Sequence, residues 1–312
     1  MQQRTVYTIG ESIFDIMFKA NDPVAARVGG GMLNTAVSLG RLNTPVFLIS
    51  EYGYDKLGDI SEEFLINNGV RIDFIKRYKD GKTPVSIALL DENNNAEYSF
   101  YKIYPEQRLN IPIPEIKHDD IVIFGSFYSV TREIRQTIVN IITKANQNKA
   151  IILYDPNFRK SHLSQLNEVM PLIYENISFA DIIHCSDEDF SLIFNIKNAN
   201  DAYKIIKKAG CSNLIYTANK KGVTLKTLNL KKSYAVPQIS PISTIGAGDS
   251  FNAGIIYALL MNNITHENIS NITPKQWDSI IKSGIATATH VCMNFDNYIS
   301  QDFAKIHKQT FI

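Results

Sequence analysis

The chain has 312 residues, of which 45% are hydrophobic and 20% are charged, an ordinary composition for a soluble protein with a large core. With 32 Lys and Arg against 31 Asp and Glu, the net charge of +1 predicts no attraction to nucleic acid or to an anionic membrane. Three widely spaced cysteines predict neither a disulfide framework nor a zinc site. Because the chain shows no apolar signal segment and no run of ~18 apolar residues, we expect a cytoplasmic protein without membrane contact.

The first segments alternate between strand and helix patterns. Arg4–Ile9 and Ile13–Phe18 have the patterns of strands, and Gly29–Gly31 precede a helix predicted over Met32–Leu42. A turn that contains a proline ends this helix before the next strand, at Val46–Ile49.

The pattern changes between about residues 71 and 104. Arg71–Tyr78, Pro84–Leu90 and Glu97–Ile103 have strand patterns with no helix between them. Such a run predicts a small antiparallel sheet that stands apart from the main fold.

Strands and helices alternate again farther along the chain. Strands are predicted at Ile121–Phe124, Ala150–Tyr154, Asp181–His184 and Asn213–Thr217, and helices near Thr131–Ala145, near Ser164–Glu175 and between Asp187 and Ala209. Strands separated by helices form βαβ units. We therefore expect an α/β fold with a doubly wound, mainly parallel sheet.

The segment Gly246-Ala247-Gly248-Asp249 precedes an apolar helix pattern. A loop of small residues at a helix start leaves backbone N–H groups free to bind an anion, and the helix dipole favours negative charge there. Asp249, beside this anion hole, could accept a proton from a hydroxyl. The arrangement suits phosphoryl transfer to an alcohol, although Asp and Gly are also common at helix starts for structural reasons alone.

Residues near the N-terminus could contact a polar ligand. Gly29–Gly31 would let a ligand approach the backbone, or would only form a tight turn. Asn34 lies one turn into the following helix, on the side of that loop. Asp15 lies within an apolar strand, where a carboxylate is costly unless it faces solvent or a polar ligand. Carboxylates and amides suit the diols of sugars.

The segment Asp155-Pro156-Asn157-Phe158-Arg159 follows a strand that is predicted to be buried. Ligands of open α/β sheets bind beyond the carboxyl ends of the strands, where this loop lies. Arg159 could neutralise phosphate charge or hold a substrate hydroxyl, or it could be a surface residue of a turn. The six histidines lack the spacing of metal ligands, so no direct metal motif is predicted.

Five motifs follow one another in a fixed order. They are Gly10-Glu11…Asp15, Gly29-Gly30…Asn34, Gly53-Tyr54-Asp55…Gly58, Asp155-Pro156-Asn157-Phe158-Arg159 and Thr244-x-Gly246-Ala247-Gly248-Asp249. In this order they resemble the ribokinase-like (pfkB) family of carbohydrate kinases over nearly the whole chain. The first and fourth motifs are most similar to the fructokinase branch.

The resemblance implies one Rossmann-like α/β domain over residues 1–312, with helices on both faces of the sheet and a small β lid from about residues 11–28 and 71–104. It implies ATP-dependent phosphorylation of a primary hydroxyl of a small sugar, with a ketohexose such as fructose as the expected substrate. Mg²⁺ would bridge the phosphates with few protein ligands. A homodimer is expected, because the lids pair two subunits in many relatives.

The resemblance also implies roles for individual residues. Asp249 would be the catalytic base, and Gly246, Ala247 and Gly248 would form the anion hole. The substrate-binding residues would be Asp15, Gly30, Gly31, Asn34, Lys102 and Arg159. ATP would contact Ser186, Asp189, Thr217, Gly222 and Gly248, and Asp189 could reach the metal through a water.

Four positions depart from the family pattern. Ser243 replaces an Asp that helps family members to bind a monovalent cation, which puts activation by K⁺ in doubt. Asp189 is one methylene shorter than the usual Glu, and Asn219 stands where a glycine is usual. Lys102 stands where fructokinase-like members often carry Arg, so the charge is kept without the bidentate geometry.

These departures leave other functions open. A keto-deoxy sugar acid would suit the charge of Lys102, and a nucleoside would suit an aromatic platform formed by Tyr98, Phe100 or Tyr101. Ribose is a further acceptor. A non-catalytic sugar- or nucleotide-binding module is the alternative of a different class, against which the intact base and anion hole argue.

Overall fold

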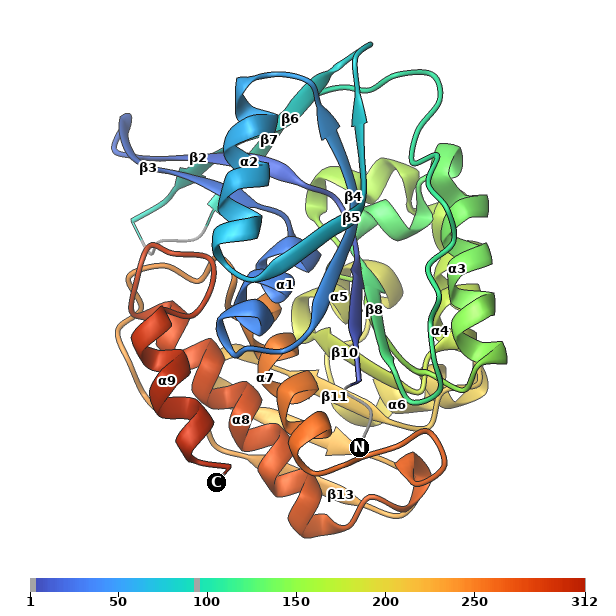
Figure 1. Ribbon diagram of the computed structural model, residues 1–312. Helices are drawn as coiled ribbons and strands as arrows, with labels where there is room; N and C mark the ends of the chain where they lie inside the picture. Colours follow the sequence, from blue (N-terminus) through green and yellow to red (C-terminus); the bar gives the residue numbers. More distant parts are fainter. Residues whose placement is uncertain (1–3, 93–95, 312) are drawn as a thin grey trace.

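The computed structural model describes residues 4–92 and 96–311, and these residues form two β-sheets of different size (Figure 1). The nine strands of the larger sheet are β1 (Val6–Ile9), β4 (Val46–Gly53), β5 (Val70–Tyr78), β8 (Ile121–Gly125), β9 (Ile151–Asp155), β10 (Ile182–Ser186), β11 (Leu214–Thr217), β12 (Val223–Lys226) and β13 (Lys231–Tyr234). Their spatial order is β13-β12-β11-β10-β9-β8-β1-β4-β5. All neighbours pair in parallel except β11 with β12 and β12 with β13, so the predicted doubly wound, mainly parallel sheet is confirmed.

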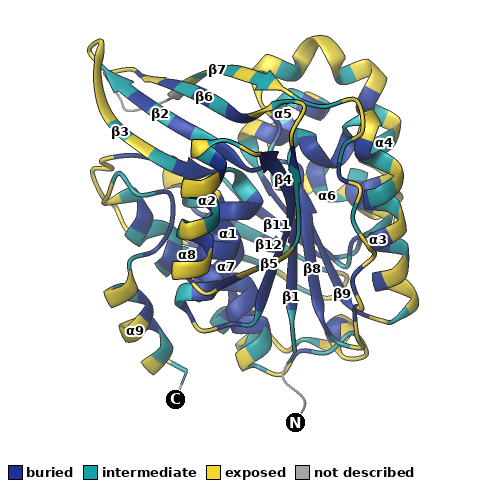
Figure 2. Cartoon of the chain, turned by 45° about the horizontal axis from the view of Figure 1, so that its top comes forward, coloured by how far each residue is buried: buried dark blue, intermediate teal, exposed yellow. Residues whose placement is uncertain are grey.

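Helices cover both faces of this sheet, because its strands carry buried apolar side chains on both sides (Figure 2). In β1, for example, Val6 belongs to one core, whereas Tyr7 and Ile9 belong to the other. The first core includes side chains of α1 (Gly31–Arg41), α2 (Lys56–Asn67), α7 (Ala247–Met261), α8 (Pro274–Cys292) and α9 (Gln301–Gln309). The second core includes side chains of α3 (Arg135–Gln147), α4 (Leu166–Phe179), α5 (Asp187–Phe194) and α6 (Ala199–Lys208).

The smaller sheet, which we call the lid, is drawn apart from the main sheet at the upper left of Figure 1. Its strands are β2 (Ile13–Lys19), β3 (Asp22–Gly29), β6 (Lys82–Leu90) and β7 (Ala96–Ile103), in the order β3-β2-β6-β7. The central pair, β2 and β6, runs parallel, so the expectation of a purely antiparallel sheet was wrong. The lid joins two hairpins that are distant in the sequence, and strand patterns alone do not determine how hairpins pair.

The segment Arg71–Tyr78 was also expected in the lid, and the structure corrects this. It belongs to β5, which pairs in parallel with β4 at the edge of the main sheet. The connection between these strands is α2, which was not predicted and whose first turn is capped by Asp55. A parallel pair needs such a crossover, so β4, α2 and β5 form one βαβ unit of the main fold.

The register of the lid determines which side chains face the main sheet. Asp15 pairs with Ser86, and Ser86 pairs with Phe100. Residues directly opposite one another project from the same face of a sheet, so these side chains share the inner face. On the outer face, Tyr101 and Ile103 are 60% and 62% exposed. That the lid is inserted in a single domain over residues 1–312 stays a prediction.

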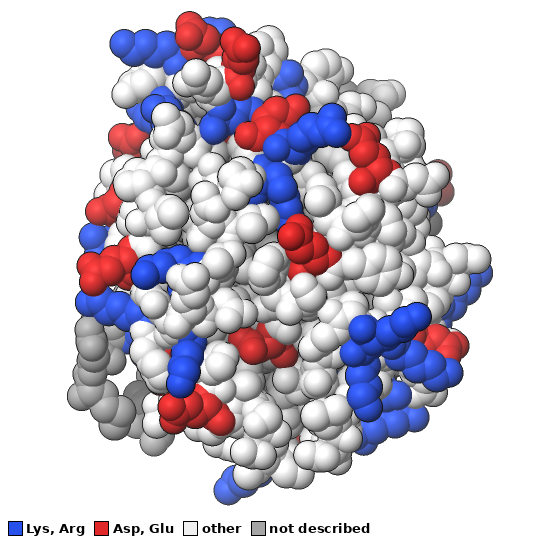
Figure 3. Space-filling view, turned by 90° about the vertical axis from the view of Figure 1, so that its right-hand side faces the viewer, with Lys and Arg blue, Asp and Glu red and all other residues white. Residues whose placement is uncertain are grey.

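The surface carries charges of both signs. On the face drawn in Figure 3, acidic and basic side chains are interspersed, and Lys and Arg gather most densely toward its lower right. None of the helices in the described ranges is long and apolar enough to cross a membrane.

Candidate active site

The inner face of the lid, the N-termini of α1 and α7 and the loop after β9 enclose one pocket. Eight of the residues predicted for catalysis or sugar binding line it, namely Asp15, Gly30, Gly31, Asn34, Lys102, Arg159, Gly246 and Asp249. They come from segments far apart in the sequence, Asp15 and Lys102 from the lid and the others from the carboxyl edge of the main sheet and the helix starts beside it.

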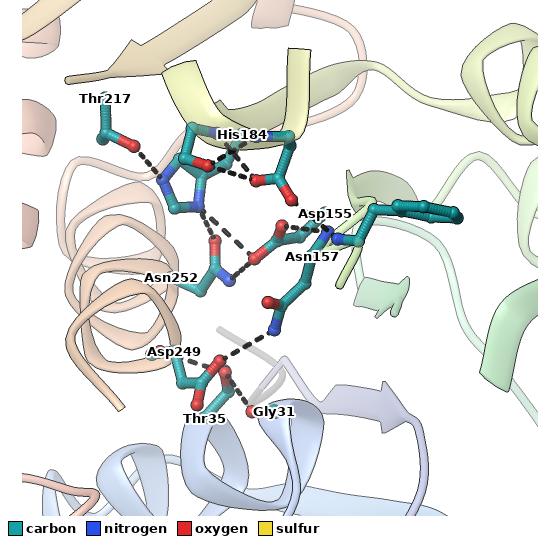
Figure 4. A network of polar contacts seen from close by, with 11 residues as sticks. Gly31, Thr35, Asp155, Asn157, His184, Thr217, Asp249 and Asn252 are labelled. Carbon is teal, nitrogen blue, oxygen red and sulfur yellow. Dashed lines mark hydrogen bonds and ion pairs between the residues drawn. The ribbon is translucent and has the colours of Figure 1, made fainter. Parts of the chain in front are cut away.

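Asp249 lies in the first turn of α7 and is only 6% exposed. Asn34 Nδ2 donates to its Oδ2 at 2.8 Å. Asn157 Nδ2 donates to its Oδ1 at 3.4 Å (Figure 4). Burial raises the pKa of Asp249 to about 7, and the negative charge of Asp155 adds to this rise. The hydrogen bond from Asn34 lowers the pKa but does not cancel the effect of burial. A carboxyl group with this pKa can exchange a proton near neutral pH.

The N-terminus of α7 is open to an anion. Gly246 precedes the helix with a left-handed φ of 78°, and no side chain caps the helix. In the described part of the chain, the N–H groups of Gly248 and Asp249 have no hydrogen-bond acceptor, and Ala247 N–H reaches only Thr244 O at 3.3 Å. Free N–H groups at a helix start attract negative charge, as predicted for this segment.

Asp15 is buried on β2, where it accepts hydrogen bonds from the Ser86 hydroxyl and from Asn297 Nδ2, the latter at 3.2 Å. Burial raises the pKa of Asp15 to about 6, although the bond from Ser86 opposes the rise. Asn34 Oδ1 and Asn297 Oδ1 are buried and have no partner among the described residues. Unpaired buried acceptors are rare and call for a donor, such as a ligand hydroxyl.

Gly30 lets the backbone of α1 approach the segment before β2. Its φ is 118°, and a Cβ at this position would lie 2.0 Å from the carbonyl oxygen of Glu11. The tight turn is therefore present, with a positive φ at Gly30, and it also lines the pocket.

Lys102 lies at the lid end of the pocket with its charge already paired. Its Nζ lies 2.7 Å from Glu11 Oε1 and 2.8 Å from Glu11 Oε2. The hydroxyl of Tyr104 also donates to Glu11. Lys102 therefore faces the pocket as part of an ion pair, and Glu11 is a pocket residue that motif reasoning did not single out as a ligand.

The loop after β9 contributes Asn157 and Arg159 to the pocket. The Arg159 guanidinium carbon lies 5.8 Å from the centre of the Tyr98 ring. His162 stacks on Phe127 with 3.9 Å between ring centres, and both rings line the pocket near Phe100. The lid end of the pocket is thus aromatic.

The residues predicted for ATP lie at the carboxyl end of β10 and in the following first turn of α5, at the end of β11, in the turn before β12 and in the first turn of α7. Ser186 caps α5, and its partner in the capping box is Asp189. Asp189 Oδ1 also accepts the N–H of Phe158 at 2.6 Å, so both of its carboxylate oxygens are engaged in holding this loop. The register places Thr217 next to Ser186.

Gly222 and Asn219 shape the turn between β11 and β12. Gly222 has a φ of 100°, and a Cβ there would lie 2.3 Å from the carbonyl oxygen of Tyr234. Asn219 has a φ of 49°, a left-handed conformation that Asn tolerates better than most residues. Asn219 therefore adopts a left-handed conformation that glycine would also tolerate.

Besides Glu11, several polar residues of the site were not predicted as site residues. Asn157 lies inside a motif, but His162, His184 and Asn297 were missed because histidines were weighed only as metal ligands and no local pattern marks Asn297. In the described residues, no cluster of three or more His, Cys, Asp or Glu could hold a metal.

Comparison with known proteins identifies the family. A family model described as pfkB family carbohydrate kinase matches residues 6–296. Aminoimidazole riboside kinase from Salmonella typhimurium is 22% identical over 291 residues, which cover 91% of each chain. Fructokinase from Rhizobium leguminosarum bv. trifolii is 26% identical over 263 residues, which cover 82% of this chain and 79% of the relative.

The fold is also that of solved kinases. A fructokinase double mutant from Vibrio cholerae O395, solved with fructose, ADP and a potassium ion, superposes with a TM-score of 0.84 at 17% identity and covers 96% of this chain and 95% of its own. The family model spans most of the chain, and the ribokinase-like fold extends over it. The chain therefore belongs to the pfkB family of carbohydrate kinases, enzymes that transfer a phosphoryl group to an alcohol.

Proposed function

We propose that the protein transfers the γ-phosphoryl group of ATP to a primary hydroxyl of a small neutral sugar, with a ketohexose such as fructose as the substrate. The observation that carries this proposal is the position of Asp249, whose buried carboxylate lies between the open N-terminus of α7 and the polar residues Asp15 and Asn34. A base beside an anion site is what transfer to a hydroxyl requires.

Each group of residues has a role in this proposal. Asp249 takes the proton of the attacking hydroxyl, while the N–H groups of Gly246, Ala247 and Gly248 stabilise the negative charge of the phosphoryl group. Asp15 and Asn34, with the backbone at Gly30 and Gly31, hold the sugar hydroxyls. Arg159 adds positive charge at the same edge of the pocket.

The pairing of Lys102 favours a neutral acceptor over a keto-deoxy sugar acid. A substrate carboxylate would have to compete with Glu11, which contacts Lys102 Nζ through both oxygens. It would also approach the negative charges of Glu11 and Asp15 in the same pocket. Polyol hydroxyls can donate to these carboxylates without such repulsion.

A riboside is the second candidate acceptor. The stacked rings of His162 and Phe127, with Phe100, form an aromatic wall at the lid end of the pocket. A planar base could pack against this wall. The 22% identical relative is an aminoimidazole riboside kinase, which supports testing this substrate class.

The residues fit a magnesium ion that is held mainly by phosphate oxygens and waters. No described cluster could bind a metal by itself, and the oxygens of Asp189 are engaged with Ser186 and Phe158. Mg²⁺ would neutralise charge on the phosphates. Ser186, Thr217 and Gly222 would lie on the nucleotide side, and Asp189 would reach the metal only through a water.

We expect the activity to be independent of K⁺. Ser243 is neutral and 1% exposed, and its Oγ accepts the N–H of Ile245 at 3.2 Å. This hydrogen bond lies within the loop before α7, and Ser243 brings no carboxylate to attract a cation there. A homodimer through the lid stays a prediction, supported by the exposed side chains of Leu89, Tyr101 and Ile103 on its outer face.

The test is an ADP-release assay over ketohexoses, aldopentoses, a keto-deoxy acid and aminoimidazole riboside, with ATP and Mg²⁺ and with or without K⁺. We expect turnover on a neutral sugar at a rate that is the same with and without K⁺. Turnover on the riboside alone would favour the second candidate. ATP binding without ADP release on any acceptor would favour a binding module and contradict the proposal.

The proposed base predicts a pH dependence. Asp249 must be ionised to accept a proton, and its pKa is raised to about 7, so kcat/KM should rise about tenfold per pH unit below this value and level off above it. Asp15, with a pKa of about 6, should steepen the fall at lower pH if it too must be ionised. The measurement is kcat/KM for the sugar from pH 5.5 to 8.5. A flat profile over this range would contradict the role of Asp249.

A further inference from the structure

Most hydrogen-bond donors that line the pocket are already engaged by the protein. Three carboxylates line it, and each accepts from protein side chains: Glu11 from Lys102 and Tyr104, Asp15 from Ser86 and Asn297, and Asp249 from Asn34 and Asn157. Three other lining side chains carry a donor and have no hydrogen-bond partner among the described residues, namely Tyr98, Ser126 and Arg159. These donors are free for a ligand.

Tyr98 is the member of this group that belongs to the lid. It lies on β7 two residues before Phe100, so both side chains project from the inner face of the lid. The two rings are nearly parallel, with 3° between their planes and 5.8 Å between their centres. The Arg159 guanidinium carbon also lies 5.8 Å from the centre of the Tyr98 ring. The ring therefore contacts both the lid and the loop after β9, and these contacts restrict where its hydroxyl can lie.

The hydroxyl of Tyr98 is accessible and carries its hydrogen. It is not sealed off from solvent, and the residue lines the pocket together with Asp15 and Asp249. A tyrosine hydroxyl is protonated at neutral pH even without a shift of its pKa, so it can donate. Burial raises the pKa of Tyr98 further, and the charges of Asp15 and Asp249 add to this rise while Arg159 opposes it.

A neutral sugar can supply the partners that the pocket lacks. The unpaired oxygens of Asn34 and Asn297 call for a hydrogen, whereas the hydroxyl of Tyr98 calls for an acceptor. A sugar hydroxyl has one hydrogen and two lone pairs, and a ring oxygen has lone pairs only. A polyol can therefore donate to the carboxylates and amide oxygens on one side while it accepts from the lid on the other.

We propose that Tyr98 is a substrate-binding residue whose hydroxyl donates a hydrogen bond to one oxygen of the acceptor sugar. The inference rests on the proposed function and adds to it a recognition contact from the lid. A site that forms a hydrogen bond to a substrate oxygen discriminates against analogues that lack this oxygen. Tyr98 thus selects among sugars by the position of one oxygen.

Tyr98→Phe tests the contact, because it removes the hydroxyl and keeps the ring against Phe100 and Arg159. It should lower kcat/KM for the best sugar of the panel about tenfold, the size of one lost hydrogen bond. The loss should appear mainly as a higher KM for the sugar, since the bond forms in the ground state as well as in the transition state. The KM for ATP should not change.

The matched control is Tyr101→Phe on the same strand. Tyr101 lies on the outer face of the lid, is 60% exposed and does not line the pocket. Its variant should keep the kcat/KM and the Tm of the parent, and Tyr98→Phe should keep the same Tm. A loss of sugar affinity confined to Tyr98→Phe would show that the hydroxyl acts on the substrate and not on the fold.

Analogues of the sugar, each with one oxygen replaced by H or CH₂, identify the partner atom. For one analogue, Tyr98→Phe should cause no further loss of kcat/KM, because both changes remove the same interaction. With the other analogues the loss should remain about tenfold. An equal loss with every analogue, or no loss with any sugar, would overturn the inference and leave the proposed function intact. No ADP release by the parent on any acceptor would overturn both.

Discussion

Replacing Asp249 with Asn is expected to lower kcat by about 100-fold or more, because the variant retains the shape of the side chain but cannot take the proton of the attacking hydroxyl. The KM values for sugar and ATP should change little, since the removed function acts in the transition state. Asn34 Oδ1 has no partner, so its amide can turn to accept from the new NH₂ group. Steady-state kinetics with the best sugar of the panel measures the effect.

The same substitution should stabilise the fold at pH 8. The pKa of Asp249 is 3.8 in the unfolded chain and about 7 in the folded protein, so the folded state binds the proton more tightly between these values. Stability is therefore lost as the pH rises from 3.8 to 7, and above 7 the full cost of a buried carboxylate is present. Asn carries no charge and avoids this cost. A variant that loses activity while its Tm rises has lost a functional group and not its fold.

A matched control for this change is Asp302→Asn. Asp302 also lies in the first turn of a helix, α9, but its side chain is 89% exposed and does not line the pocket. Its removal should leave kcat unchanged. If Asp249→Asn instead kept the kcat of the parent, Asp249 would not be the base, and the proposal for its role would be wrong.

The central part of the main sheet was predictable because β8, β9 and β10 are each followed by a helix pattern. The assignment of Arg71–Tyr78 to the lid failed because α2 has a weak pattern and was not recognised, which removed the crossover that marks β5 as parallel. The pairing of β2 with β6 could not be predicted either, because it joins hairpins about seventy residues apart and no local sequence pattern specifies it.

In the candidate site, the sequence predicted residues that lie in short motifs and missed those whose role depends on distant contacts. Asp249 and Asp15 lie in such motifs. His184 acquires its partners only when β9, β10, β11 and α7 come together. The pairing of Lys102 with Glu11 likewise joins residues 91 positions apart, so the positive charge looked free for a substrate carboxylate. Charge along a sequence does not reveal which charges are already compensated.

Asn297 is the missed residue with the widest consequence, because it links the two halves of the site. Its side chain donates to Asp15 on the lid, and its backbone packs against Gly246 at the start of α7. A Cβ on Gly246 would lie 2.2 Å from the carbonyl oxygen of Asn297 and 2.7 Å from its Cα. Asp15 and the start of α7, the proposed anion hole, are thus both held by Asn297, one through its side chain and the other through its backbone.

Gly246→Ala is therefore expected to lower kcat/KM by about 100-fold or more, because a displacement near 1 Å at such a site can cost that much. It should also lower the free energy of unfolding by roughly 2–4 kcal/mol, since alanine must adopt a φ of 78° and push against backbone atoms that cannot rotate away. Kinetics and thermal unfolding measure the two effects.

Gly248→Ala tests the same chemical change two residues along the chain. Gly248 is exposed within the first turn of α7, and a Cβ there would meet only His184 Cε1, at the ordinary contact distance of 3.9 Å. This variant should keep the Tm of the parent or exceed it, because alanine favours a helix over glycine. The two glycines look equivalent in the sequence, and only their surroundings separate them. Equal Tm values for both variants would show that the close approach of Asn297 to Gly246 does not hold the start of α7 in place.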